Sequence, residues 1–297
     1  MSGIDSTRAW LHYGIGNRGL PDGDKRRGYT ISRGWELARV GFDAILDNRS
    51  LIILPLISTL VMGMVTISFL GGYFLTLNLE NGIPYTLVLL IVLLYFIASI
   101  VMVFFNVALI GAAMLYMEGG DPTVGYGIRF ASERLWLIIQ WSMLVATVNV
   151  LLSLFRRTAG VGGQIVSGLA GVAWSVATFF AVPVLAFERL TPIDAIKRST
   201  QVLRSTWRET LFSNLGIWVV FFILGITAFL PLFAAFVWMG ADIGLIILAI
   251  SIIYWIFLGA LYGGVSGVLV SALYRYAVTG KVHPDLPIAL VHNPWTY

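Results

Sequence analysis

The chain has 297 residues, of which 58% are hydrophobic and only 11% are charged, and its mean hydropathy is +0.87. Soluble proteins carry about 25% charged residues, so this chain has too few charges to cover a soluble fold and is predicted to be an integral membrane protein. It has no cysteine, and its three histidines (His12, His283 and His292) lie near the chain ends. Disulfides, thiolate chemistry, and histidine-ligated haem or metal at membrane depth are therefore excluded, and we expect no cofactor.

Six apolar stretches are long enough to cross a bilayer, which needs about 20 residues per helix. None of them contains Asp, Glu, Lys, Arg or His, and polar segments separate them. Because the alternating pattern of barrel strands is absent from the sequence, the predicted fold is all-α, a polytopic bundle of six transmembrane helices. In chain order, the predicted spans are Leu51–Leu77, Pro84–Met117, Leu135–Phe155, Ile165–Phe187, Leu211–Met239 and Ile243–Tyr274.

The basic residues divide unequally between the two sides of this bundle. With six spans, 17 of the 19 Lys and Arg residues lie on the side that carries both chain ends, and only Arg156 and Arg157 lie on the other. The positive-inside rule therefore predicts that both termini are cytoplasmic. Residues 1–30 have no apolar segment of the signal-peptide type, so they are expected to be a cytoplasmic tail, followed by a membrane domain over 31–280 and a second tail over 281–297.

Three cytoplasmic segments, at about 32–48, 121–134 and 191–208, carry a helix start signal followed by an amphipathic helix and a hairpin of spans. In the third segment Thr191 is predicted to be the N-cap and Pro192 the first helical residue. Asp121 and Pro122 are predicted to play these parts in the second. One interpretation is three parallel repeats related by an axis near the membrane normal; the other is that two-span units look alike through topology alone.

Small residues recur at every fourth position in two spans, a spacing that lets helix backbones approach closely. Contact within the bundle is one interpretation, and contact with another subunit or another copy is the alternative. The predicted helix-packing positions are Gly163, Ser167, Gly171 and Ser175 in the fourth span, and Gly259, Gly263, Gly267 and Ser271 in the sixth.

Basic residues gather on the third amphipathic helix. A basic amphipathic helix beside a span attracts anionic lipid or docks a partner, whereas the simpler alternative is a solvated face that only enforces topology. The residues expected to contact lipid or partner are Lys197, Arg198, Arg204, Arg208 and Trp207.

Neutral polar residues occur within the spans. The lack of charged residues at membrane depth argues against a proton relay or a cation carrier. A neutral amide there is typical of an interhelical hydrogen bond, and the alternative is a substrate path, with a proline kink freeing backbone carbonyls. The residues that would line such a path are Asn106, Gln140, Asn149 and Pro183.

No residue pattern indicates an enzyme. The glycine-rich segment 160–163 lacks the Lys-Ser/Thr of a phosphate-binding loop and follows no predicted strand. Glu118 with Asp121, or Glu188 with Asp194, could be read as acid pairs, but helix capping and topology explain them more simply. The basic residues are scattered and lie in no recognised module, so no nucleic-acid partner is expected.

Six strings in a fixed order resemble an uncharacterised family of six-span prokaryotic membrane proteins, known only as a domain of unknown function. The resemblance covers about residues 31–280 and implies a multi-pass protein of a prokaryotic cell (plasma) membrane, with no catalytic residue to carry over. The strings are Ile31–Leu37, Phe104–Leu109, Glu118–Pro122, Ala173–Thr178, Ala195–Ser199 and Ala272–Tyr276.

These observations predict a non-catalytic membrane scaffold or an accessory or assembly subunit of a membrane complex. Its expected partners are membrane lipids, together with a protein complex or further copies of the chain. The alternative is a transporter or channel for a neutral or lipidic substrate. A fold-level resemblance cannot decide between them, because function depends on the site rather than on the fold.

Overall fold

The structure is a computed structural model that describes residues 39, 41–76, 85–158, 160–227, 229–238 and 241–279. Within these ranges, it describes the backbone but not the side chains of residues 72–76, 85–88, 158, 161, 205–217, 234–238 and 241. The two predicted tails and positions 32–38 of the first amphipathic segment lie outside the described residues. The described backbone is helical, with short turns. After a short helix over 41–47 come α2 (Ser50–Thr76), α3 (Tyr85–Met117), α4 (Val124–Ser132), α5 (Leu135–Thr158), α6 (Gly160–Ala177), α7 (Ala181–Phe187), α8 (Pro192–Thr227), α9 (Phe229–Trp238) and α10 (Ala241–Thr279).

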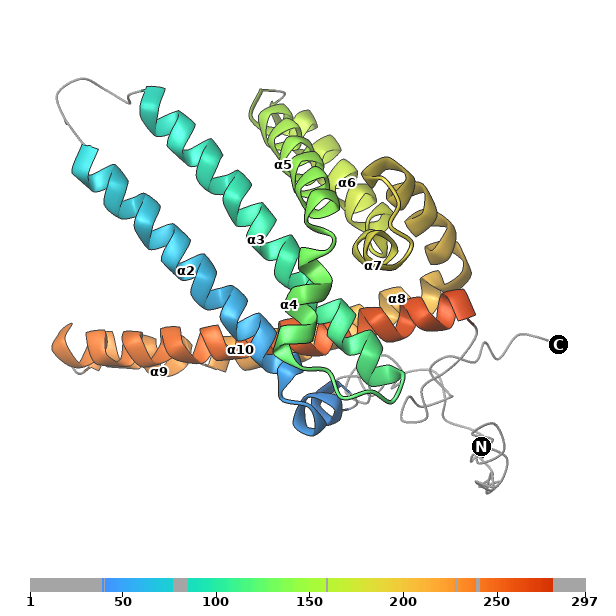
Figure 1. Cartoon of the computed structure of the whole chain (residues 1–297). Helices are drawn as coiled ribbons and strands as arrows, with labels where there is room; N and C mark the ends of the chain where they lie inside the picture. Colours follow the sequence, from blue (N-terminus) through green and yellow to red (C-terminus); the bar gives the residue numbers. More distant parts are fainter. Residues whose placement is uncertain are drawn as a thin grey trace, which may run out of the picture.

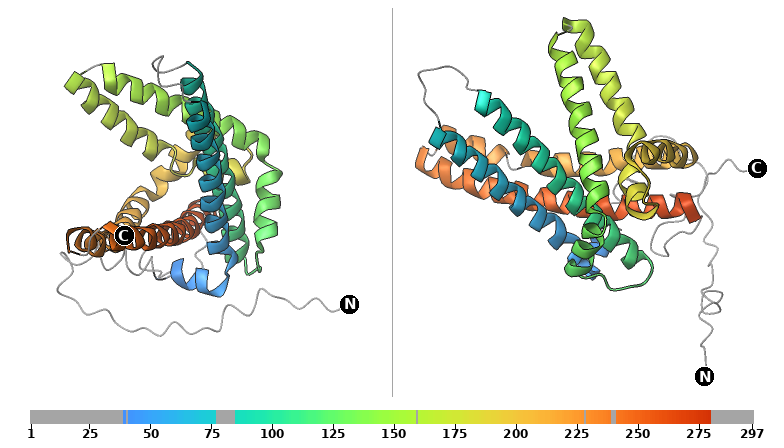
Figure 2. Two further views of the ribbon diagram at one scale, coloured as in Figure 1. Left: turned by 90° about the vertical axis from the view of Figure 1, so that its left-hand side faces the viewer. Right: turned by 45° about the horizontal axis from the view of Figure 1, so that its top comes forward.

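The long helices form three antiparallel units: α2 with α3, α5 with α6, and the end of α8 and α9 with α10. These units converge at one end and spread apart away from it (Figures 1 and 2). The third unit is held partly by side chains of α10, since Tyr254 Oη donates to the carbonyl of Leu224 at 2.8 Å and Trp255 Nε1 donates to that of Gly225 at 3.1 Å.

The core lies where the three units meet. Helix α3 is central, because it contacts α2, α4, α5, α7 and α10. Burial of large apolar side chains at this junction stabilises the fold by about 1.5–3 kcal/mol for each side chain. Fully buried members of the core include Leu51, Leu54, Val107, Ile110, Ile138, Phe180, Val184, Leu185 and Val265.

Five stretches of the described chain are long and apolar enough to cross a membrane, so the protein is an all-helical membrane protein within the described residues. A shorter apolar stretch, Trp218–Phe233, covers part of the fifth predicted span. The structure does not describe the side chains of several other residues in that span. The status of this segment as a sixth span therefore stays a prediction. The five stretches are Ser50–Gly71, Leu89–Met117, Leu135–Arg157, Gly162–Phe187 and Asp242–Thr279.

The fourth predicted span is interrupted at residues 178–180, between α6 and α7. Pro183 accounts for the position of this break, because proline has no N–H to donate and its ring clashes with the carbonyl four residues earlier, that of Phe179. The N–H of Phe180 donates instead to Ser199 Oγ on α8, at 3.0 Å, and Ser199 is fully buried. The break thus ties α7 to α8 rather than leaving a buried donor unpaired.

One predicted helix start is confirmed and another is wrong. Helix α8 begins at Pro192, and Thr191 Oγ1 accepts from the N–H of Asp194 at 3.4 Å, as expected of an N-cap. Helix α4, however, is capped by Thr123, whose Oγ1 accepts from the N–H of Tyr126 at 3.1 Å. Asp121 is not the cap because its carboxylate accepts a hydrogen bond from Asn48, which lies 73 residues away in sequence.

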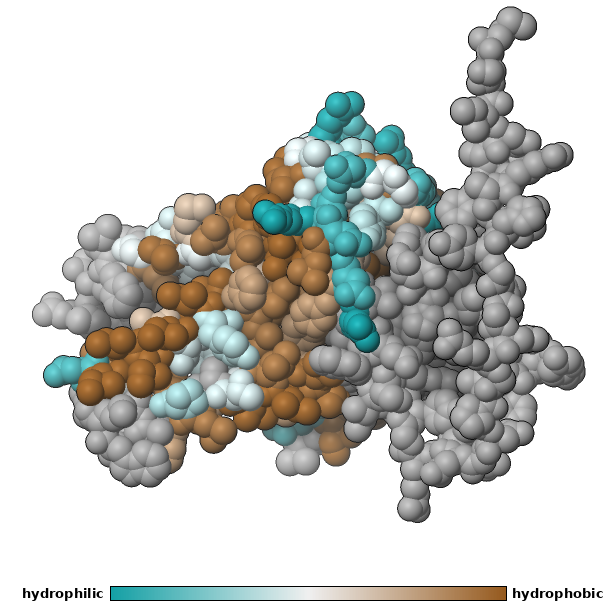
Figure 3. Space-filling view, turned by 90° about the horizontal axis from the view of Figure 1, so that it is seen from below, coloured by the Kyte–Doolittle hydropathy of each residue, from teal (hydrophilic) through white to brown (hydrophobic). Residues whose placement is uncertain are grey.

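Much of the surface is apolar. Figure 3 shows a broad hydrophobic face crossed by a band of hydrophilic residues. Large exposed apolar side chains occur along the spread parts of the units, for example Leu60, Met64 and Ile67 on α2 and Ile253 on α10. A surface of this kind is suited to lipid acyl chains or to another membrane subunit.

Candidate functional site: a polar hub beside an apolar cavity

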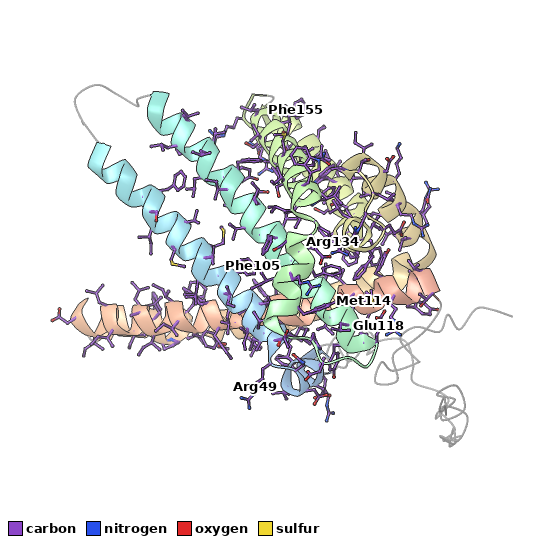
Figure 4. All side chains as sticks on the ribbon, viewed as in Figure 1. Arg49, Phe105, Met114, Glu118, Arg134 and Phe155 are labelled. Atoms are coloured by element: carbon purple, nitrogen blue, oxygen red, sulfur yellow. The ribbon has the colours of Figure 1, made fainter. Side chains whose placement is uncertain are left out.

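Polar side chains from all three units meet at the end where the units converge. Figure 4 places Met114, Glu118 and Arg134 near this end, and Phe155 at the far end of α5. We call the set the polar hub; it consists of Asp47, Asn48, Tyr116, Asp121, Arg134, Glu188, Arg198, Tyr274 and Arg275.

Arg134 is the most buried cation of the hub, with only 8% of its side chain exposed. Its Nε donates to the carbonyl of Ala186 at 2.5 Å, and a second guanidinium nitrogen donates to the carbonyl of Phe130 at 2.7 Å. Burial lowers the pKa of Arg134 and the nearby Arg189 lowers it further, while Glu133 opposes both effects. Arginine nevertheless stays protonated, so the guanidinium is a permanent donor that joins the ends of α4 and α7.

An aromatic row continues this connection toward α10. The guanidinium of Arg134 lies 3.5 Å from the centre of the Phe130 ring, a cation–π contact. The centre of the Phe130 ring is 5.4 Å from that of Phe187, which stacks on Tyr274 at 6.0 Å. Aromatic pairs at these distances contribute about 0.5–1.5 kcal/mol each beyond their burial, so the row fastens α4 and α7 to α10.

Two further hydrogen-bonded sets join the start of α2 to the α3–α4 connection. Asn48 Nδ2 donates to Asp121 Oδ1 at 2.5 Å and to the carbonyl of Pro122 at 3.1 Å. Tyr116 Oη donates to Asp47 Oδ2 at 2.9 Å. The carboxylate of Asp121 therefore serves a tertiary contact between the start of α2 and the α3–α4 connection.

Glu188 connects α7 with α8 and α10. It accepts from Arg198 Nε at 3.0 Å and from Tyr274 Oη at 2.9 Å, while a guanidinium nitrogen of Arg275 donates to the carbonyl of Met117. An acid or base must have its reacting oxygen accessible to a substrate, whereas the carboxylate of Glu188 is held by two donors. The geometry thus favours a structural role for Glu188.

The predicted lipid- or partner-contacting residues do not share one environment. Lys197 Nζ lies 3.1 Å from Asp194 Oδ1, and Arg198 is paired with Glu188. Arg204 is exposed, while the side chains of Trp207 and Arg208 lie outside the description. Hydrogen bonds from Thr191 and then from Lys197 lower the pKa of Asp194. The Asp194 carboxylate therefore stays ionised at neutral pH and holds Lys197 beside the start of α8.

The predicted helix-packing stripe on α10 is used unevenly. A Cβ atom at Gly267 would collide with Leu109 of α3, and one at Gly263 would lie 3.6 Å from Pro55 of α2, whereas a Cβ at Gly259 would meet no atom within 4 Å. Ser271 is buried and donates to the carbonyl of Gly267. The end of the stripe near the hub packs against α2 and α3, and the other end opens into free space.

On α6 the stripe has a mixed environment. Gly163 and Ser167 are buried, and Ser167 Oγ donates to the carbonyl of Gln164. Ser175 is exposed, and a Cβ at Gly171 would meet nothing within 4 Å. Gly171 therefore makes no close helix contact within the described chain.

A cavity of about 550 Å³ lies among α2, α3, the α6–α7 break and α10. Its volume is within the range of about 300–1,000 Å³ that is usual for small-molecule sites. Of the four predicted path residues, Asn106 and Pro183 line it, whereas Gln140 and Asn149 lie on α5 and do not. The structure therefore brings two of the four together at one cavity.

No motif in the sequence marks Arg134 or Tyr274 as a site residue. Arg134 stands in the sequence as a lone arginine directly before a span, where its positive charge is its only evident property. An arginine at a span boundary is also suited to hydrogen-bond backbone carbonyls across a junction. No sequence signal indicated that Ala186 and Phe130 supply those carbonyls. Their approach depends on the break between α6 and α7.

Among the described residues, no group of three or more His, Asp or Glu side chains is placed to hold a metal ion. A comparison with protein families matches residues 85–283 to a family described as a family of unknown function, DUF6159. No curated protein matches the chain.

Proposed function

The chain belongs to this family of unknown function, and we propose from its geometry that it is a non-catalytic scaffold or accessory subunit of a membrane protein complex. The observation that carries the proposal is the polar hub. Its ionic groups bind one another and backbone carbonyls of neighbouring units, as the pairing of Glu188 with Arg198 and Tyr274 illustrates. A hub of this kind holds three membrane units together and presents their apolar faces to other molecules.

The proposal includes six spans, the fifth formed by the end of α8 with α9, and cytoplasmic termini in the plasma membrane of a prokaryote. The charge distribution supports this orientation, because Arg156 and Arg157 lie at the α5–α6 end away from the hub. A repeat of three units is supported by the helices that precede the units: residues 41–47 before α2, α4 before α5, and the first part of α8.

Variants with one introduced cysteine test the orientation of the chain in the membrane. The chain has no cysteine of its own, so the labelling has no background. We expect Arg157→Cys to react with a membrane-impermeant maleimide added to intact cells. Lys197→Cys, at an exposed position near the start of α8, is expected to react only after permeabilisation. Asp242→Cys, at the start of α10, is expected to behave like Arg157→Cys because the fifth span carries it across. Labelling of Asp242→Cys only in permeabilised cells would exclude a sixth span.

The partner is tested by extraction from the native membrane in mild detergent, followed by native electrophoresis and identification of co-migrating proteins. We expect a foreign membrane protein at fixed stoichiometry. Deleting residues 1–29, which lie outside the described chain, is expected to reduce its recovery if the tail contributes to docking. A species that contains this chain alone, in one or several copies, would refute the accessory role.

The cavity favours a second candidate function, the carriage of a neutral or lipidic substrate. It contains Asn106 and Pro183, two of the residues predicted to line a path. This candidate predicts movement of substrate between the two leaflets. Reconstituted vesicles with a fluorescent lipid in one leaflet measure that movement, and a rate equal to that of protein-free vesicles would exclude it.

A further inference from the structure

The cavity has an uncharged wall. Its lining includes Pro55 and Thr59 on α2, Asn106 on α3 and Ser266 on α10, and none of its lining residues is Asp, Glu, Lys, Arg or His. A buried ion without a counter-charge is strongly disfavoured. The part of a ligand that enters this cavity is therefore uncharged.

The cavity lies within the apolar part of the helices. Asn106 is eleven residues before Met117, the last residue of α3, which places it about 16 Å along the helix axis from the hub end. Met102 lines the cavity and is itself 62% exposed on the apolar surface. The cavity thus communicates with the surface that faces the hydrocarbon region, where lipid chains are the surrounding solvent.

Asn106 gives the cavity a specific polar contact. The residue is exposed on the cavity wall, and no hydrogen bond joins its side-chain amide to another group of the described chain. Thr59, by contrast, donates its hydroxyl to the carbonyl of Pro55 at 2.9 Å. An amide without a partner in an apolar medium is costly, so a ligand oxygen that accepts from Asn106 would be stabilised there.

We propose that the cavity among α2, α3, the α6–α7 break and α10 binds an uncharged lipid, with its long chain against the apolar wall and an ester or hydroxyl oxygen hydrogen-bonded to Asn106. At about 30 Å³ per water-sized group, the cavity has room for on the order of 18 methylene groups, the length of one lipid chain. The proposal concerns the cavity alone, and it holds whether the protein is a scaffold or a carrier.

The test uses the full-length protein in phosphatidylcholine vesicles that contain increasing fractions of a diacylglycerol with a diazirine in one acyl chain. After irradiation, the modified residues are identified by mass spectrometry. We expect modification to saturate and to map to the lining residues of α2, α3 and α10. Non-saturating modification spread evenly over the exposed faces of α2, α6 and α10 would overturn the proposal.

Two pairs of variants make the test specific. Gly259 lines the cavity, and a Cβ there would have no atom within 4 Å. Gly168 on α6 does not line the cavity, and a Cβ there would also have no atom within 4 Å. Gly259→Leu fills the cavity and is expected to raise the half-saturating fraction of the probe at least about tenfold, because the added side chain displaces ligand methylene groups. Gly168→Leu is expected to leave it unchanged. Equal behaviour of the two variants would contradict a site in the cavity.

Asn106→Leu keeps the side-chain size but removes the amide, and it is expected to weaken diacylglycerol labelling about fivefold, the effect of one hydrogen bond. Labelling by a diazirine-bearing alkane, which has no oxygen, is expected to stay the same. Asn149→Leu, the same substitution on α5 away from the cavity, is the control. If Asn106→Leu weakened both probes equally, or neither, the hydrogen bond to the lipid would be refuted. Matching unfolding midpoints establish that the variants are folded.

Discussion

Gly127→Val is expected to destabilise the protein by about 3 kcal/mol through overpacking. Gly127 is buried where α4 crosses α3, and a Cβ there would lie 2.9 Å from the backbone oxygen of Ala108 and 2.9 Å from Cδ1 of Leu54. The leucine terminus can turn away, but a carbonyl in the middle of α3 cannot move without distorting that helix. The measurement is equilibrium unfolding in mixed micelles by a denaturing detergent.

The matched control is Gly125→Val, two residues earlier in the same helix. Gly125 is exposed, and a Cβ there meets only Thr123 Oγ1, at 3.9 Å. Valine has a slightly better helix propensity than glycine, so this variant is expected to be as stable as the original protein or marginally more stable. Similar losses in both variants would show that α4 is sensitive to side-chain bulk in general and is not docked through Gly127.

Arg134→Ala is the second large expected effect, a loss of about 3 kcal/mol in unfolding free energy. The substitution removes the donors to the carbonyls of Ala186 and Phe130 and the cation–π contact with the Phe130 ring. Arg134→Lys is expected to restore only part of the loss, because one ammonium cannot reproduce the fork of the guanidinium. The same detergent-unfolding titration measures both variants.

Arg129→Ala is the control for the loss of a positive charge at this place. Its side chain is 84% exposed and lies 3.5 Å from Glu133, which also contacts Arg134. Exposed ion pairs contribute about 0–1 kcal/mol, so a small change is expected. If Arg129→Ala cost as much as Arg134→Ala, the net charge of the α4–α5 connection, and not the buried hydrogen bonds, would hold the hub together.

The class of the protein follows from the sequence because it depends on composition and on run length. A long uncharged stretch that lies in a bilayer must pair its backbone N–H and C=O groups within the chain, which a helix does. The structure has apolar helices over most of these stretches. The start of α8 is equally local, since Thr191, Pro192 and Asp194 lie within one turn of helix. Membership of a family of unknown function also agrees with the resemblance found in six short strings, although the family match begins at residue 85.

The contacts that shape the site depend on residues far apart in the chain. Asp121 looks like an N-cap from its neighbours, yet Asn48 binds it across 73 positions and Thr123 caps α4 instead. Ser199 receives the N–H that the break at Phe180 releases. Such pairings are decided by how helices pack, which a local pattern does not encode.

The same reason separates the predicted path residues. Each of the four is an amide residue or a proline within an apolar stretch, so the sequence alone does not distinguish those that line a cavity from those that do not. Helix packing places Asn106 and Pro183 on one cavity wall and leaves Gln140 and Asn149 on α5. Sequence by itself determined that this is a helical membrane protein. Only the tertiary structure decided which polar groups meet, because those meetings are set by close contacts between separate helices.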